Sequence, residues 1–127
     1  IYYKGTIEDW CNISFGYDAN PMAYAKNFYM LNENNEWCEK NVIEIPDTIK
    51  NIDKYQFYGF GSLEKLSISK NVISIDETSF KECNNIKQLI ISENFLDEIE
   101  NLFTSEIILK KYRNKEYVIK DGMVIFE

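Results

Sequence analysis

A repeat of 23 residues between Val42 and Tyr112 constrains this chain more than any other feature of its sequence. Such a repeat is a single structural unit, which buries its apolar edge only by stacking on the next unit. The repeat therefore predicts a fold that is mainly β with short helices, built as a short solenoid of 23-residue coils. The apolar residues fall into five columns: Ile43, Leu66, Leu89 and Tyr112; Ile45, Ile68 and Ile91; Ile49, Val72 and Phe95; Phe57, Phe80 and Phe103; and Leu63, Ile86 and Leu109.

Each predicted coil begins with a strand and returns on the opposite side. The alternation of Ile43 and Ile45 indicates a strand with one buried face, and Ile49 and Ile52 mark a second short extended segment. In the third coil the apolar residue of that segment moves from the column of Ile52 to Ile99. This shift predicts a local bulge.

Residues 1–41 predict an N-terminal cap of a strand, short helices and a hairpin. Thr6 followed by Asp9 is a near match to a capping box and starts the first helix. Pro21 suits the first position of a second helix, which continues from Met22 to Lys26. Predicted strands at 27–31 and 37–45 flank a polar turn at 32–36.

We expect three segments, which are the cap at 1–41, the repeat coils at 42–112 and a last segment at 113–127. The last segment has two possible structures. Asp121-Gly122 between two apolar runs favours a C-terminal hairpin, whereas Phe126 continues the phenylalanine column and favours a degenerate repeat. Because the chain begins inside a predicted strand, we expect it to be a piece of a longer protein.

Composition argues against several classes of function. The net charge of −7 disfavours nucleic acid, because a phosphate backbone would be repelled. There is no histidine, which removes the commonest general base and the commonest zinc ligand. We therefore predict no enzyme, no metal and no cofactor, and the absence of a long apolar run predicts no membrane insertion of this segment.

The three cysteines lack metal-ligand spacing. Cys83 falls in the column of Phe60, so we expect a buried apolar side chain. Cys11 and Cys38 could form a disulfide in a secreted protein, and this pairing stays open.

The repeat resembles the BspA-like class of leucine-rich repeats, whose coil has an I-x-I-P strand, a V-x-x-I segment, an A-F-x-x-C knob and a closing leucine. The matching residues are Ile43-Glu44-Ile45-Pro46, Val72 to Ile75, Ser79-Phe80-Lys81-Glu82-Cys83, and Leu63 or Ile86. Tyr2-Tyr3-Lys4-Gly5-Thr6 with Trp10 and Asn20-Pro21-Met22 resembles the inserts between blocks of such coils. The resemblance implies an extracellular or cell-surface protein that uses its repeats for adhesion or partner binding. It implies no reaction.

The strand face of the predicted solenoid is the first candidate for protein binding. Outward strand residues of adjacent coils lie about 4.8 Å apart and form rows. The row residues that we predict to bind a partner are Glu44, Lys65, Ser67, Gln88, Ile90, Lys111 and Arg113. An ordinary solvated sheet face is the alternative interpretation.

Aromatic residues of the N-terminal segment offer a second candidate surface. Trp10, Tyr17 and Trp37 could stack on sugar rings and form a glycan-binding site, or they could cap the apolar end of the solenoid. A structural spacer without a ligand is a third possibility. Unpaired strand edges at the ends of a solenoid also make self-association possible.

Overall fold

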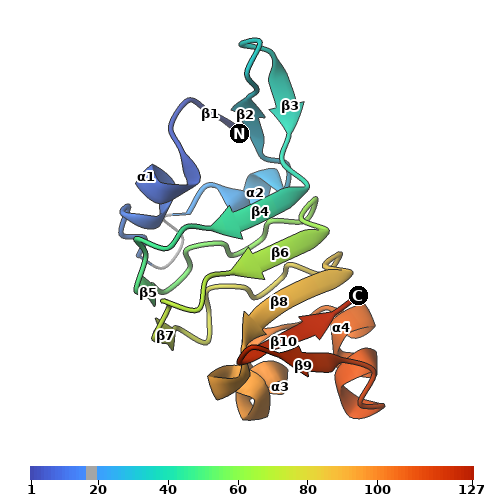
Figure 1. Ribbon diagram of the computed structural model, residues 1–127. Coiled ribbons are helices and arrows are strands. Elements are labelled where there is room, and N and C mark those ends of the chain that lie inside the picture. Colours follow the sequence, from blue (N-terminus) through green and yellow to red (C-terminus); the bar gives the residue numbers. More distant parts are fainter. Residues whose placement is uncertain (17–19) are drawn as a thin grey trace.

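The computed structural model describes residues 1–16 and 20–127, which form a mainly β structure with short helices (Figure 1). In this part of the chain, a small sheet contains β1 (Tyr2–Tyr3), β2 (Tyr29–Leu31) and β3 (Trp37–Glu39). The largest sheet has the order β4 (Val42–Ile45), β6 (Lys65–Ile68), β8 (Gln88–Ser92), β10 (Met123–Phe126) and β9 (Val118–Lys120). A third sheet pairs β5 (Asn51–Ile52) with β7 (Ser74–Ile75).

Residues that lie 23 apart in the sequence are paired in the parallel strands. Ile43 lies opposite Leu66, and Leu66 lies opposite Leu89, with all three side chains buried. Ile52 lies opposite Ile75 in the second parallel pair, β5 with β7. The alternation of buried and exposed residues in β4 and β6 follows the pleat of a sheet with one buried face.

The phenylalanine column forms a stack of rings in the core. The ring centroids of Phe57 and Phe80 lie 5.4 Å apart, and those of Phe80 and Phe103 are also 5.4 Å apart. All three side chains are buried. The stack therefore joins three successive turns of the chain in the same register as the strands.

After β8 the chain becomes helical, with the 3₁₀ helix η1 (Glu93–Glu98) followed by α3 (Ile99–Leu102). The predicted bulge near Ile99 is wrong. Phe95, Ile99, Leu102 and Phe103 are all buried, and their spacing is that of one helical face. The shift of the apolar residue to Ile99 thus marks a change from the two-residue period of a strand to the 3.6-residue period of a helix.

The strand expected around Tyr112 is also replaced by a helix, α4 (Glu106–Arg113). Ser105 caps this helix, because its Oγ accepts a hydrogen bond from the N–H of Ile108 at 3.5 Å. Basic residues lie in the last turn, where they are favourable to the helix dipole. The run of parallel strands therefore ends at β8.

An antiparallel strand takes the next place in the large sheet. β10 pairs with β8, and β9 pairs with β10 in a hairpin whose turn residues Asp121 and Gly122 have φ values of 53° and 78°. These positive values are those of a type I′ turn. Phe126 lies opposite Leu89 and does not follow Phe103 in the ring stack, so it extends a strand column.

The N-terminal segment adds α1 (Ile7–Cys11) and α2 (Met22–Ala25). The predicted capping box is confirmed, since Thr6 and Asp9 exchange backbone-to-side-chain hydrogen bonds of 3.0 and 3.1 Å. Helix α2 begins at Met22 as predicted, with Pro21 as its N-cap, and ends one residue before the predicted Lys26. The hairpin of β2 and β3 is confirmed.

The strand predicted at 37–45 divides into β3 and β4, which belong to different sheets. Lys40 still donates its N–H to the carbonyl of Phe28 at 2.7 Å. The next residue, Asn41, accepts hydrogen bonds from the N–H groups of Glu64 at 2.8 Å and Lys65 at 3.1 Å. Asn41 is therefore the point at which the chain leaves the small sheet for the large one.

Trp10 and Gln56 bind the N-terminal segment to the repeat. Trp10 is 3% exposed, and its ring packs against Phe28 and Phe60. Its Nε1–H donates to the Gln56 carbonyl at 2.7 Å, while Gln56 Nε2 donates to the carbonyls of Trp10 at 2.6 Å and Ile13 at 3.0 Å. The N-terminal residues thus share one core with the parallel strands.

All three cysteines are free thiols, so Cys11 and Cys38 are not bridged. Cys11 is buried within α1, whereas Cys38 is exposed on β3. Cys83 is buried as predicted, and its Sγ contacts the Phe57 carbonyl at 3.0 Å. Burial raises the pKa of the Cys83 thiol to about 12.

Candidate functional site

The outer face of the large sheet brings together most of the residues predicted to bind a partner. Lys65 on β6 lies opposite Gln88 on β8. Glu44 on β4 lies opposite Ser67, and Ser67 lies opposite Ile90. These five side chains alternate with the buried residues of their strands, so they form two adjacent rows on one face.

The hairpin of β9 and β10 extends one of these rows. Ile125 lies opposite Ile90 on one side and opposite Val118 on the other. Val118 is 60% exposed, while Ile90 and Ile125 are half-buried. We call the row Glu44, Ser67, Ile90, Ile125 and Val118 the outer row; it changes from polar to apolar along its length.

The prediction from the repeat missed Ile125 and Val118, because it placed a fourth parallel strand beside β8. The sequence does contain the signal that finds them. Asp121-Gly122 predicts the hairpin, and the hairpin has apolar residues on both strands. What the sequence lacks is a pattern that places this hairpin against β8.

Lys111 lies in α4 and not in the strand row where it was predicted. Its ammonium nevertheless reaches the residue before β8, since Nζ donates to the Lys87 carbonyl at 3.3 Å. Lys111 also lines an open hollow together with Lys65 and Gln88. It therefore stays beside the predicted surface, although it belongs to a helix.

Arg113 does not lie with Lys65, and its predicted place in the strand face is wrong. Its Nε donates to Glu100 Oε1 at 2.8 Å, and its Nη1 lies 3.9 Å from Glu106 Oε2. It lines a different hollow with Leu96 and Tyr117. The hydrogen bond with Glu100 also raises the pKa of the Arg113 guanidinium.

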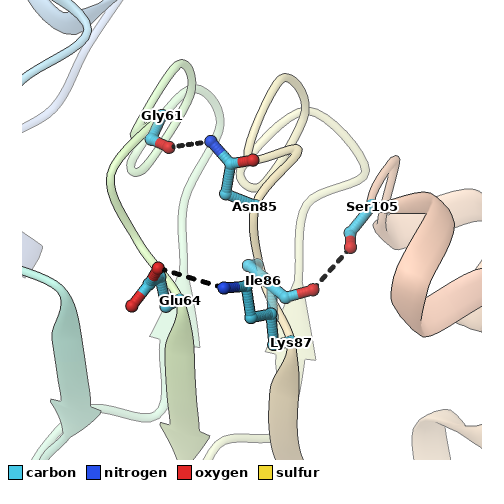
Figure 2. A network of polar contacts seen from close by, with 6 residues as sticks. All are labelled: Gly61, Glu64, Asn85, Ile86, Lys87 and Ser105. Atoms are coloured by element: carbon cyan, nitrogen blue, oxygen red, sulfur yellow. Dashed lines mark hydrogen bonds and ion pairs between the residues drawn. The ribbon is translucent and has the colours of Figure 1, made fainter.

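Polar contacts hold successive turns together where β6 and β8 begin (Figure 2). Asn85 Nδ2 donates to the Gly61 carbonyl at 2.5 Å, and Lys87 Nζ lies 3.4 Å from Glu64 Oε1. Ser105 Oγ donates to the Ile86 carbonyl at 2.6 Å. The exposed ion pair contributes little to stability. The hydrogen bonds to the carbonyls of Gly61 and Ile86 fix the backbone just before Lys65 and Gln88.

The aromatic residues predicted to bind a glycan have different positions. Trp10 is buried and hydrogen-bonded, so it has no free ring face and the glycan-binding alternative is wrong for this residue. Tyr17 lies outside the described residues. Trp37 is 41% exposed on β3.

Trp37 belongs to an exposed cluster on the small sheet, which we call the aromatic cluster and which contains Tyr2, Tyr29 and Trp37. The Tyr2 ring is 66% exposed and stacks on Tyr29 with centroids 4.8 Å apart. Trp37 meets Tyr2 edge-on at 5.1 Å. Only Trp37 of this cluster was predicted, because the sequence does not reveal that β1 pairs with β2.

Two further properties concern the chemistry of the described residues. No cluster of three or more acidic, cysteine or histidine side chains among them is placed to hold a metal ion. None of the helices in the described ranges has the length and apolar character required to cross a bilayer.

We compared the chain with known protein families, curated proteins and solved structures. Residues 33–123 match the BspA type leucine rich repeat region, in 6 copies. No match was found among curated proteins or among solved structures. The family match spans well over half of the 127 residues and includes the parallel strands β4, β6 and β8, so the chain belongs to the BspA-type leucine-rich repeat family.

Proposed function

We propose that the chain is a short solenoid that serves as a non-enzymatic protein-interaction and adhesion module of a cell-surface or secreted protein. The partner is a protein, and it binds the outer row. The observation that carries this proposal is the run of Ile90, Ile125 and Val118 across three neighbouring strands of the outer face. Contiguous exposed apolar residues with a polar surround are typical of protein-binding surfaces.

Charges beside the outer row support a protein partner over a lipid or a nucleic acid. Glu44 and Lys65 lie at the polar end of the face, and Lys111 lies in the adjoining hollow. Mixed charges around an apolar centre contribute specificity and association rate more than affinity. A net charge of −7 argues against any polyanionic partner.

The test is binding to an array of immobilised purified extracellular proteins, with matched variants of the chain. Ile90→Ser removes apolar area from the centre of the outer row, and Lys65→Gln removes a positive charge beside it. We expect Ile90→Ser to weaken binding about tenfold or more, as central apolar residues of an interface do. Lys65→Gln should mainly slow association.

Arg113→Gln is the matched control, because it removes one exposed positive charge from outside the outer row. Its binding should equal that of the wild type. An equal loss in Arg113→Gln and Lys65→Gln would mean that overall charge, and not this face, determines binding. Unchanged binding of Ile90→Ser would exclude the outer row.

A second candidate function is carbohydrate binding by the aromatic cluster. Exposed rings that are fixed by one another, as Tyr2 is by Tyr29 and Trp37, can stack on the apolar face of a sugar ring. On a glycan array, Trp37→Ala should abolish binding, whereas Tyr24→Ala removes an exposed aromatic residue elsewhere and should not. If neither the outer row nor the aromatic cluster affects any binding, the chain acts as a structural spacer.

A further inference from the structure

We propose that two copies of this chain associate through the free edge of β9, in antiparallel register centred on Val118. β9 is the last strand of the five-stranded sheet, and it pairs with β10 on one side only (Figure 1). At the opposite end of that sheet, β4 is in contact with α1. Within the described residues, β9 is thus an end strand with one unpaired edge, and all three of its residues are exposed.

The free edge has hydrogen-bonding groups in the correct direction. Lys120 and Met123 close a two-residue type I′ turn, so they are a hydrogen-bonded pair, and so are Val118 and Ile125 two residues further on. The N–H and carbonyl of the residue between them, Ile119, therefore point away from β10. A strand with such groups unpaired is a template for another strand.

The side chains of β9 favour association over solvation. Val118 is 60% exposed and Ile119 is 49% exposed, and both are β-branched residues suited to strands. The edge has no proline and no bulge, which are the usual means of blocking it. Lys120 is the charged residue within the strand. A strand that pairs with this edge must therefore place an acidic residue opposite Lys120.

A second copy of the chain provides an acidic residue opposite Lys120. In the register centred on Val118, Lys120 of each copy lies opposite Glu116 of the other, which gives two opposite-charge pairs by symmetry. Ile119 then lies opposite Tyr117, and their outward backbone groups form the hydrogen-bonded pairs. The N–H of Glu116 is not needed for this pairing, since it donates to the Lys111 carbonyl of its own copy at 2.8 Å.

In the neighbouring register, centred on Ile119, the outward backbone groups also form hydrogen bonds, but Lys120 does not lie opposite an acidic residue. There Lys120 lies opposite Val118, and Tyr117 lies opposite Asp121. Charge pairing therefore selects the register centred on Val118. In that register the apolar ends of the two outer rows meet at Val118, so one continuous apolar stripe crosses both copies.

The test combines sedimentation equilibrium with charge exchange. We expect wild-type chain at about 0.5 mM to approach twice its 15.0 kDa monomer mass. Lys120→Glu and Glu116→Lys each replace two attractive pairs by two repulsive ones and should weaken the dimer about tenfold or more. The double variant restores both attractive pairs and should recover the wild-type dimer.

Ile119→Pro is the backbone test, because it removes an outward N–H without removing a bond to β10. It should be monomeric with an unchanged near-ultraviolet circular dichroism spectrum. If this variant fails to fold, the charge exchange still decides the question. A wild type that stays monomeric at about 0.5 mM overturns the proposal, and so does a dimer in which the single charge variants and the double variant have equal affinity.

Discussion

At position 56 the chain has a glutamine where the repeat pattern has a small residue, and this difference has a structural role. The position 23 residues later is Ser79, and the BspA-like pattern has a small residue there. Both side chains are buried, but Gln56 extends across to the carbonyls of Trp10 and Ile13, whereas Ser79 donates to the nearby Asp76 carbonyl at 2.6 Å. The departure thus provides the hydrogen bonds that hold the N-terminal segment.

We predict that Gln56→Leu destabilises the fold by about 2 kcal/mol, because it removes the hydrogen bonds to the carbonyls of Trp10 and Ile13 while nearly preserving side-chain volume. Ser79→Ala, at the equivalent position, should cost about 1 kcal/mol. Urea unfolding of the two variants measures the difference. A Gln56→Leu variant as stable as the wild type would mean that the Gln56 contacts do not contribute to stability.

The cysteines should differ sharply in reactivity. Burial raises the pKa of both Cys11 and Cys83 to about 12, and the Glu8 carboxylate adds to the effect at Cys11. Since the thiolate is the reactive form, a short pulse of iodoacetamide at about pH 8 should modify Cys38 alone. Peptide mass spectrometry reads the positions, and modification of Cys83 before unfolding would contradict the prediction.

The same shifts predict how stability depends on pH. The neutral thiols are favoured in the folded chain, so their contribution is complete below the unfolded pKa of about 8.5 and is lost as pH rises toward 12. Cys83→Ala removes one of these groups. Its free energy of unfolding should therefore fall less steeply than that of the wild type above about pH 8.5.

Among the elements, the turns after the phenylalanine column share an unusual backbone conformation. Gly59 and Glu82 occupy equivalent positions in successive turns, and both have positive φ, 80° and 64°. Glycine adopts this conformation without strain, whereas a glutamate at such a position costs roughly 1 kcal/mol. The second turn therefore has a strain that the first one avoids.

Glu82→Gly should raise the free energy of unfolding by about 0.5–1 kcal/mol, and Gly59→Ala should lower it by a similar amount. Thermal unfolding of the two variants beside the wild type measures both effects. A destabilised Glu82→Gly would show that the Glu82 side chain contributes more than the backbone strain costs.

Elements whose residues contact others one repeat away were predictable from sequence. The pairing of Ile43 with Leu66 and the ring stack of Phe57 and Phe80 both follow directly from the spacing. Helix α4 was not predicted, because Tyr112 and Leu109 satisfy the 23-residue spacing and a helical spacing at once. The helix has its own cap at Ser105, and that local signal is what the repeat pattern obscured.

In the candidate site, too, the residues that follow the repeat were predictable and the others were not. Lys65, Ser67, Gln88 and Ile90 lie together because they belong to parallel strands in register. Arg113 does not join them, because it follows the last parallel strand and pairs with Glu100. Val118 and Ile125 could not be assigned to the face without knowing that an antiparallel hairpin lies against β8.

At the scale of the whole molecule, one core includes the N-terminal segment and the repeat turns. Ring contacts of Trp10 and Phe28 with Phe60, and the hydrogen bonds of Gln56, join the two parts. Contacts of this kind make neighbouring parts unfold as one unit. The chain should therefore behave as a single cooperative domain.

Trp37→Phe leaves Trp10 as the one remaining tryptophan, since the chain has 2. We predict that urea unfolding of this variant followed by Trp10 fluorescence coincides with unfolding followed by far-ultraviolet circular dichroism. Fluorescence reports the N-terminal segment, and circular dichroism reports all sheets and helices. A fluorescence midpoint at a lower urea concentration would show that the N-terminal segment unfolds first.

The register of β4, β6 and β8 has a genetic consequence. Each of these strands presents to the next the same hydrogen-bonding edge and the same buried side-chain positions that it receives from the one before. An in-frame duplication of one such unit by unequal recombination inserts a turn whose strand finds partners on both sides, and a deletion closes without an unpaired strand. The array can thus change length in a single event, while the segments that cover its two ends stay the same.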